Sequence, residues 1–366
     1  MNLAILVGHF PPGAFGGAEL QAEAWARHLS DHHRVTVITR RDPPDPPPDE
    51  TRDGFRVLRL PVSSMPVVRT ALDLAAIERA VAGLDPRPDL LLCFQTFISG
   101  LAGVRVQRRL GIPAVVWVRG EAEYRLRGWT RMRAVSPWVW ARARGVLVQS
   151  DGVRLELLAE LERVAPRLRA AVVGKLEVVP NGLDLPEVEP GRGGRVLSVG
   201  RLIPDKGMDV VIDAVAGMQG LLTIAGEGPE RTRLEARARA HGLDARFEGF
   251  VPRERLDRLF REASVVVLAA HRGEGLSNVV LEAFARGRPV VATEIPGVRE
   301  LVVDGVNGLL VPAGDPLRLR DALARVAHER GLADRLARAG RHTAETFGWP
   351  RVRPKLEALL SRWSAA

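Results

Sequence analysis

Residues 195–216 read RVLSVGRLIPDKGMDVVIDAVA, and this stretch decides the fold class. A short β-branched run, Arg195–Val199, passes through a glycine-containing turn into Met208–Ala216, whose apolar spacing predicts a helix. The same alternation fills the chain and favours an α/β protein with doubly wound parallel sheets. The other predicted strands are Leu3–Val7, Arg34–Thr39, Phe55–Leu60, Leu90–Phe94, Ala114–Val118, Gly145–Gln149, Leu176–Val179, Leu221–Ala225, Ala245–Glu248, Val265–Leu268, Pro289–Ala292 and Gly308–Val311.

The alternation breaks once, near the middle of the chain. Residues 186–194, Pro-Glu-Val-Glu-Pro-Gly-Arg-Gly-Gly, have no periodicity and the turn-rich composition of a linker. We therefore predict one domain over residues 1–185 and a second over residues 186–366, whose last helix, within about 347–366, packs back on the first domain. Two such domains present the carboxyl edges of their sheets to a central cleft, where ligands bind in this fold class.

Composition narrows the function classes. The 366 residues are 46% hydrophobic and 27% charged, as in globular proteins, and no apolar run approaches the ~18 residues of a spanning helix. Met1–Gly8 reads as a first strand rather than a signal peptide, and the lone Cys93 excludes an internal disulfide, so we expect a cytoplasmic protein. The net charge of +9 favours anionic partners, although a compositional bias towards arginine explains it equally well. The Pro/Asp-rich run Asp42–Glu50 is expected to be an exposed extended loop.

The most informative pattern is Glu274-Gly-Leu-Ser-Asn-Val-Val-Leu-Glu282, which follows a predicted strand. Glu274 falls in the turn, and Glu282 lies two helical turns further on. The amides of Leu276, Ser277, Asn278 and Val279 fall where a helix begins, and unpaired amides at the positive end of a helix dipole bind anions. This arrangement suits the sugar, phosphates and ribose of a nucleotide sugar. Taken alone, Glu282 would be an ordinary solvated helix position.

A basic loop, Gly200-Arg201-Leu-Ile-Pro-Asp-Lys206-Gly207, follows the first strand of the second domain. Arg201 offers a fork of donors to phosphate oxygens, and Lys206 offers a point charge. The only other lysines are Lys175 and Lys355, so composition does not explain the presence of Lys206. The loop therefore predicts a diphosphate site.

Two glycine pairs are weaker signals. Gly16-Gly17 join the first strand to the first helix and allow the backbone to approach an anion. Gly226-Glu-Gly228 resembles the beginning of a dinucleotide-binding fingerprint, but Arg231 stands in place of the third glycine. We interpret the second pair as a turn that contacts the donor.

These residues together resemble the retaining nucleotide-sugar glycosyltransferases of glycosyltransferase family 4, which have the GT-B fold of two Rossmann-like domains facing a central cleft. The resemblance covers essentially the whole chain and is densest over residues 195–312. The motifs that carry it are Gly200-Arg201…Lys206-Gly207, Gly226-Glu-Gly-Pro229, Glu274…Glu282 with the following Ala283-Phe-Ala285, and Pro180-Asn-Gly-Leu-Asp184.

The resemblance implies a role for each residue. Arg201 and Lys206 would neutralise the departing diphosphate in place of a metal ion, so neither metal nor cofactor is expected. Together with Glu274, which would contact the donor sugar, they would form the catalytic set, and Glu282 would hold the ribose. The remaining donor-binding residues would be Gly200 and Gly226, Phe250 and Val251 at the base, Leu276, Ser277, Asn278 and Val279 at the phosphates, and Gly16 and Gly17 from the other domain.

Two places depart from the family pattern. Members commonly have a His-Gly or His-Asp pair after the fifth strand, where this chain reads Val118-Arg119-Gly120-Glu121. Arg119 cannot act as a neutral base near pH 7, but Arg119 and Glu121 suit phosphate or sugar hydroxyls. Ala270-His271 replace the usual Pro-Ser before the first glutamate. His9, at the end of the first strand, is either a substrate contact or a plain loop histidine.

The resemblance also implies partners. The donor would be a UDP- or GDP-linked sugar and the acceptor a glycan, a lipid-linked or a small molecule, with no nucleic acid involved. Tyr124–Ser150 contains arginines and tryptophans but no acidic residue, which favours peripheral contact with the anionic inner face of a membrane. The competing interpretation makes the tryptophans core residues and the arginines a solvated face. Pro137 is expected to interrupt any continuous helix there.

Two other function classes stay open. The first is an NAD(P)-dependent oxidoreductase on tandem Rossmann units, which would leave Glu274 and Glu282 unexplained and lacks a complete glycine fingerprint. The second is a non-catalytic nucleotide- or glycan-binding relative. The presence of Arg201, Lys206 and both glutamates argues against it, whereas Arg119 leaves it open.

Overall fold

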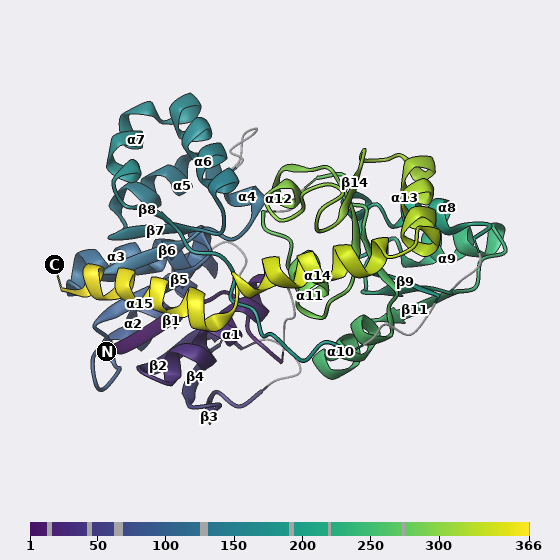
Figure 1. Cartoon of the computed structure of the whole chain (residues 1–366). Helices are drawn as coiled ribbons and strands as arrows, with labels where there is room; N and C mark the ends of the chain where they lie inside the picture. The colour runs from purple at the N-terminus through teal and green to yellow at the C-terminus, as the bar shows by residue number, and fades with distance from the viewer. Residues whose placement is uncertain are drawn as a thin grey trace. The chain divides into compact units, whose positions relative to one another are not determined.

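The computed structural model describes residues 1–12, 17–41, 46–61, 69–124, 131–189, 194–218, 221–272 and 275–365. Its contacts divide the chain into two compact units (Figure 1). The first unit comprises Met1–Gly182 with Trp349–Ala366, and the second comprises Leu183–Gly348. The second unit is therefore an insertion between the body of the first unit and its last helix. Within the described residues, no helix combines the length and apolarity needed to cross a membrane.

The first unit contains an eight-stranded sheet in the order β3-β4-β2-β1-β5-β6-β7-β8. All neighbours pair in parallel except β3, which is antiparallel to β4. The strands are β1 (Asn2–Leu6), β2 (Arg34–Arg40), β3 (Asp49–Arg52), β4 (Phe55–Leu60), β5 (Leu90–Phe94), β6 (Ala114–Trp117), β7 (Gly145–Val148) and β8 (Leu176–Val178).

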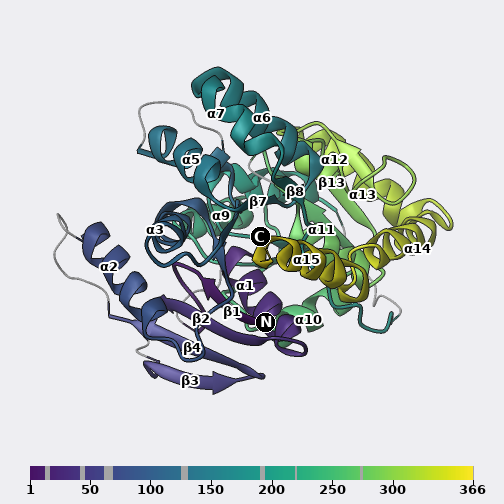
Figure 2. The ribbon, with the colours of Figure 1, turned by 90° about the vertical axis from the view of Figure 1, so that its left-hand side faces the viewer.

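Helices cover both faces of this sheet, because β1 alternates between two buried sides. Leu3 and Ile5 pack with α1 and α15, whereas Ala4 and Leu6 pack with α2, α3 and α5 on the opposite face (Figure 2). Burial on both faces is what the continuous apolar runs of parallel strands predict. The helices are α1 (Gly17–Ser30), α2 (Arg69–Ala82), α3 (Leu101–Leu110), α4 (Glu121–Tyr124), α5 (Arg131–Arg142), α6 (Asp151–Val164), α7 (Pro166–Val173) and α15 (Trp349–Ser364), with a short π-helical turn at Thr96–Gly100.

The second unit contains a six-stranded parallel sheet in the order β11-β10-β9-β12-β13-β14. Helices α8, α9 and α13 pack on one face, and α10, α11 and α12 pack on the other. The strands are β9 (Arg195–Val199), β10 (Leu221–Ala225), β11 (Ala245–Gly249), β12 (Val265–Leu268), β13 (Val290–Thr293) and β14 (Leu309–Val311). The helices are α8 (Met208–Val215), α9 (Arg231–Ala240), α10 (Arg253–Glu262), α11 (Asn278–Ala285), α12 (Pro296–Arg299), α13 (Pro316–His328) and α14 (Leu332–Glu345).

Two local expectations are wrong. The run predicted to be a loop up to Glu50 ends inside strand β3, which ion pairs from Asp49 to Arg56 and from Glu50 to Arg59 attach to β4. Strand β3 consists of charged and polar residues, so a search for apolar alternation does not predict it. Helix α5 continues through Pro137. The neighbouring Val139 and Trp140 are fully buried, and their packing offsets the hydrogen bond that the proline removes.

Candidate active site

The strand order of the second unit reverses between β9 and β12. The chain runs from β9 outward to β10 and β11, then crosses to β12 on the other side. The loops that follow β9 and β12 diverge at this switch point, which is where open α/β sheets bind ligands. The basic loop follows β9, and the segment containing Leu276–Val279 follows β12. The fold therefore brings the two strongest sequence motifs to one place.

The loop after β9 is fixed against the loop after β12. Gly207 has φ +61°, and a Cβ there would lie 2.0 Å from the carbonyl oxygen of Ala269, so only glycine fits. The carboxylate of Asp205 accepts a hydrogen bond from Arg272 Nε at 3.0 Å. These contacts hold Lys206 beside the segment that continues towards residue 274.

The two predicted cations differ in exposure. Arg201 is exposed and Lys206 is half-buried. Gly200, which precedes them, donates its amide to the carbonyl oxygen of Ala225 at 3.0 Å and so anchors the loop to the end of β10. Glu274 lies outside the described residues, so its catalytic role stays a prediction.

Gly226 and Gly228 allow two loops to pack backbone against backbone. A Cβ on Gly226, which has φ +148°, would lie 1.9 Å from the carbonyl oxygen of Gly200, and one on Gly228 would lie 2.3 Å from that of Leu202. Close loop packing accounts for both glycines without a pyrophosphate ligand. The donor contact predicted for Gly226 stays a prediction.

The segment predicted to receive the base follows β11. The amide of Gly226 donates to the carbonyl oxygen of Gly249 at 2.8 Å, so the loops after β10 and β11 touch. Phe250 comes next and is 51% exposed, while Val251 packs against the core on the α11 face. A large exposed aromatic ring at the carboxyl edge of a sheet is a surface on which a planar base can stack.

Helix α11 begins at the predicted anion site. Ser277 is its N-cap, and the Ser277 hydroxyl accepts a hydrogen bond from the amide of Val280. Leu276 and Ser277 are buried, whereas Asn278 and Val279 are partly exposed. The first amides of an α-helix have no partner within the helix, and the dipole adds positive potential there. The described geometry therefore suits a phosphate, although the sequence did not predict that the Ser277 side chain is used as a cap.

Glu282 lies on the partly exposed side of α11, with 24% of its side chain accessible. Its carboxylate is 3.6 Å from Nη1 of Arg286. Nη2 of the same arginine pairs with Asp257, and its Cζ lies 5.0 Å from the ring centroid of Phe260. Burial raises the pKa of Glu282 above the usual carboxyl range, and the positive charge of Arg286 opposes that shift. A half-buried carboxylate held by a neighbouring guanidinium is well suited to accept hydroxyl hydrogen bonds.

The first unit reverses its strand order between β1 and β5. His9 follows β1 and is half-buried, and Gly17 is exposed at the first position of α1. The neighbouring Gly16 lies outside the described residues. Glu121 opens α4, but the structure describes nothing of its side chain. The substrate and donor roles predicted for these four residues stay predictions.

Arg119 follows β6 on the same edge of the sheet. Its guanidinium lies over the rings of Trp117 and Phe94, 5.0 and 5.4 Å from their centroids, and Nη2 donates to Asn181 Oδ1 at 2.8 Å. Nε and Nη1 are buried and have no hydrogen-bond partner among the described residues. Burial lowers the pKa of Arg119 to about 10, although the charges of Glu123 and Glu19 oppose the shift, so the side chain stays cationic at neutral pH.

Glu123 organises the backbone around Arg119. One carboxylate oxygen accepts the amides of Arg119 and Gly120, both at 2.9 Å, and the other accepts the amide of Thr96 at 2.6 Å. Burial raises the pKa of Glu123, and the amide hydrogen bonds oppose that shift. Sequence reasoning missed this residue. It also assigned no contact to Asn181, although Asn181 stood inside a motif that it quoted.

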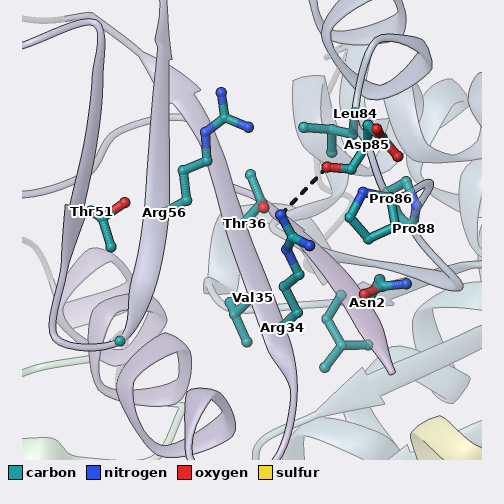
Figure 3. A pocket seen from close by; sticks show the side chains of 12 residues that line it. Asn2, Arg34, Val35, Thr36, Thr51, Arg56, Leu84, Asp85, Pro86 and Pro88 are labelled. Atoms are coloured by element: carbon teal, nitrogen blue, oxygen red, sulfur yellow. Dashed lines mark hydrogen bonds between the residues drawn. The ribbon is translucent and has the colours of Figure 1, made fainter.

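A hollow in the first unit lies away from these residues (Figure 3). It has a volume of about 190 Å³ and is lined by residues at the amino ends of β1, β2 and β5, among them Asn2, Arg34 and Pro88. Arg34 points across it and donates to the carbonyl oxygen of Asp85 at 3.5 Å. Ligands of parallel sheets bind at the opposite, carboxyl edge, so this hollow has no place in the predicted site.

The predicted independence from metal stays a prediction. Within the part of the chain that the structure describes, no three His, Cys, Asp or Glu side chains gather as a metal site requires.

Comparison with known families agrees with this geometry. Residues 16–182 match the family described as glycosyl transferase 4-like domain, and residues 186–343 match the family described as glycosyl transferases group 1. A GDP-mannose-dependent alpha-mannosyltransferase of Mycobacterium tuberculosis is 29% identical, over 100% of this chain and 97% of its own. A D-inositol 3-phosphate glycosyltransferase of Nocardiopsis dassonvillei is 30% identical, over 93% of this chain and 88% of its own.

Solved structures share the fold. Sucrose-phosphate synthase from Thermosynechococcus elongatus superposes with a TM-score of 0.85 at 22% identity, covering 100% of this chain and 99% of its own. Anabaena HepE in complex with UDP-glucose gives a TM-score of 0.79 at 20% identity, covering 99% and 100%. The two Rossmann-like sheets are those of the GT-B class. The chain belongs to the family 4-type glycosyltransferases, as the sequence motifs predict.

Proposed function

We propose that this glycosyltransferase moves a sugar from a nucleoside-diphosphate donor to an acceptor hydroxyl, with retention at the anomeric carbon and without a bound metal. The observation that carries the proposal is the β9/β12 switch point, where Arg201, Lys206 and the start of α11 meet at one sheet edge. The relatives support the donor class, since one is a GDP-mannose-dependent alpha-mannosyltransferase and the structure of HepE is a complex with UDP-glucose.

The proposed chemistry centres on the departing diphosphate. The bond from the anomeric carbon to the diphosphate breaks, the acceptor oxygen bonds to that carbon on the same face, and its proton passes to the leaving phosphate oxygen. Arg201 and Lys206 offset the negative charge that develops on the diphosphate, which is the electrostatic work that a metal ion does elsewhere. The amides at the start of α11 receive phosphate oxygens, and Glu274 contacts the sugar.

Glu282 and Phe250 complete the proposed donor site. The carboxylate of Glu282 accepts hydrogen bonds from the ribose hydroxyls, while Arg286 fixes its position. The exposed ring of Phe250 and the backbone of Val251 receive the base. Recognition of the base through backbone groups leaves UDP and GDP both open as the donor nucleotide.

The acceptor is proposed to be a glycan, a lipid-linked or a small molecule, as in glycoconjugate synthesis. In the basic segment, Trp140 is fully buried and donates to Thr96 Oγ1 at 2.9 Å, which makes it a core residue. Trp138 is only partly buried and carries Arg142 over its ring at 4.4 Å. We propose that this remaining part of the segment contacts anionic lipid. Sedimentation with vesicles containing phosphatidylglycerol, but not with neutral vesicles, is the expected result.

The oxidoreductase alternative is not favoured. It rested on the tandem Rossmann-like units and lacked a complete glycine fingerprint. Contacts of their loop with Gly200 and Leu202 explain both glycines of the Gly226-Glu-Gly228 turn. The chain also belongs to a glycosyltransferase family over both units.

A thermal-shift series with UDP, GDP, ADP, NAD and NADP tests the proposed function. A ligand that binds only the folded state raises the melting temperature, so UDP or GDP should stabilise the chain. Lys206→Ala should abolish that shift, whereas Lys355→Ala, which removes an exposed lysine of α15, should keep it. Stabilisation by NAD or NADP alone would contradict the proposal. Comparison of the anomeric configuration of donor and product by NMR tests retention, and assay after EDTA treatment tests metal independence.

A further inference from the structure

The hydrogen bonding of the Arg119 guanidinium is unusual for a buried cation. Buried guanidinium groups normally pair with carboxylates and satisfy their donors. Among the side chains that the structure describes, no carboxylate lies within ion-pair distance of Arg119. The charges of Glu123 and Glu19 act on it from further away, and both oxygens of Glu123 accept hydrogen bonds from backbone amides. Among the described residues, the guanidinium has one hydrogen-bond partner, Asn181 at Nη2, and Nε and Nη1 are buried without a partner there.

Such a group destabilises the fold unless a ligand uses it. Leaving buried donors unsatisfied costs free energy, and a partner anion would recover it. The chain around Arg119 is nevertheless tightly organised. Glu123 holds its backbone amide, and Gln149 Nε2 donates to its carbonyl oxygen at 2.8 Å. The guanidinium packs over the rings of Trp117 and Phe94. This is the construction of a preorganised binding group rather than of a surface arginine.

We propose that Arg119 binds a phosphoryl group of a substrate at the carboxyl edge of the first unit. The inference rests on the proposed function, and it adds an anion-binding residue where relatives commonly have histidine. A guanidinium presents parallel donors that match phosphate geometry, which an imidazole does not. Arg119 is partly exposed as a residue, so an anion that reaches its guanidinium can accept hydrogen bonds from Nε and Nη1 while Nη2 keeps its bond to Asn181.

Two substrates could supply this group. One is the diphosphate of the donor. The other is a phosphate on the acceptor, as the names of the inositol 3-phosphate glycosyltransferase relatives suggest. The chemistry recognised by Arg119 is the same in both cases, and titrations separate the two sources.

Three variants test the proposal. Arg119→Met removes the charge and keeps the length over the rings, and Arg119→Lys keeps the charge without the fork of donors. Arg362→Met is the matched control, because Arg362 also lies over a tryptophan ring of the first unit, that of Trp363, and belongs to no proposed binding site. Calorimetric titrations of the full chain with UDP, GDP, inorganic phosphate and inositol 3-phosphate give the affinities, and thermal melting gives the stability.

We expect Arg119→Met to weaken binding of at least one ligand about tenfold or more, Arg119→Lys to weaken it less, and Arg362→Met to leave it unchanged. A loss confined to UDP or GDP identifies the donor diphosphate, and a loss confined to phosphate and inositol 3-phosphate identifies the acceptor. Because an apolar side chain replaces an unsatisfied buried cation, the melting temperature of Arg119→Met should lie no more than about 3 °C below that of the wild type.

The proposal fails if Arg119→Met leaves every affinity within about twofold of the wild type. It also fails if that variant unfolds or melts much lower, since this would show that Arg119 is a structural link to Asn181. A wild-type chain that binds phosphate but neither UDP nor GDP would contradict the proposed function alone. In that case the phosphate titration of Arg119→Met still decides the role of Arg119.

Discussion

The two switch points of this protein are organised by opposite means. In the second unit, Gly207 and Gly226 allow neighbouring loops to pack closely because they carry no Cβ, and Arg201 is exposed. In the first unit, the charged groups themselves are buried, with Arg119 over two aromatic rings and Glu123 beneath three amides. The carboxyl edge of the second unit's sheet is therefore organised by close backbone packing, and that of the first unit's sheet by buried charged side chains. The following substitutions test this difference.

Gly226→Ala should have the largest effect on stability. The new Cβ would meet the carbonyl oxygen of Gly200 at 1.9 Å in a conformation that alanine rarely adopts, which should cost about 3 kcal/mol or more in the free energy of unfolding. Gly217→Ala is the control, because Gly217 also has positive φ but a Cβ there would meet no atom within 4 Å, so its cost should be about 1 kcal/mol. Urea denaturation measures both, and equal losses would refute the packing explanation.

Lys206→Ala should lower kcat/KM for sugar transfer about 100-fold or more while the melting temperature stays unchanged. The reason is that the charge on the leaving diphosphate would lose a fixed cation. Lys355→Ala should remain within about twofold of the wild type, which shows that the effect is local. Steady-state assays with saturating acceptor give these values. Normal turnover in Lys206→Ala would remove this loop from the donor site.

Glu123→Gln should destabilise the first unit by about 2 kcal/mol, because an amide group cannot accept three backbone hydrogen bonds and would place a donor opposite the amide of Thr96. Glu162→Gln, on an exposed position of α6, should change the free energy of unfolding by less than about 0.5 kcal/mol. If both variants unfold at the same urea concentration, buried charge is not what organises this edge.

The smallest expected effect concerns pH. The raised pKa of Glu282 means that its carboxylate takes up a proton at higher pH than an ordinary carboxyl group. Ribose hydroxyls donate to the ionised form, so donor affinity should decrease about tenfold as pH falls through that pKa. Calorimetry from pH 7 downward measures the decrease. Glu282→Gln should show weaker binding with a flatter profile, whereas the exposed Glu254→Gln should keep the wild-type profile.

Sequence reasoning recovered the second switch point more fully than the first. A glycine-bounded basic loop after a strand can be recognised from residue spacing, and the structure has this loop, with Gly207 at positive φ, after β9. The donor-binding roles of Arg201 and Lys206 stay predictions. Strands with continuous apolar runs were equally visible. The charged edge strand β3 was not, because its pairing with β4 depends on ion pairs between segments.

The buried charges of the first unit were harder to foresee. Arg119 attracted attention only because it replaces a histidine common in the family. Neither its hydrogen bond to Asn181 nor the carboxylate of Glu123 beneath its amide follows from local sequence. The contact with Asn181 joins positions separated by 62 residues, and only the assembled sheet brings them together. Gly16, Glu274 and the side chain of Glu121 lie outside the described residues, and their roles, like those of the other predicted site residues, stay predictions.

Because α15 is the last helix, the two units are completed at different points during translation. Helix α15 supplies Trp349, Leu356 and Leu360 to the core that also contains Trp25 of α1 and Trp117 of β6. A ribosome that has made residues 1–348 has therefore completed every residue of the second unit, but the first unit still lacks α15, one of the two helices that pack on one face of its sheet. The inserted unit can fold while the nascent chain grows, whereas the unit that is translated first must wait for the final helix before it is complete.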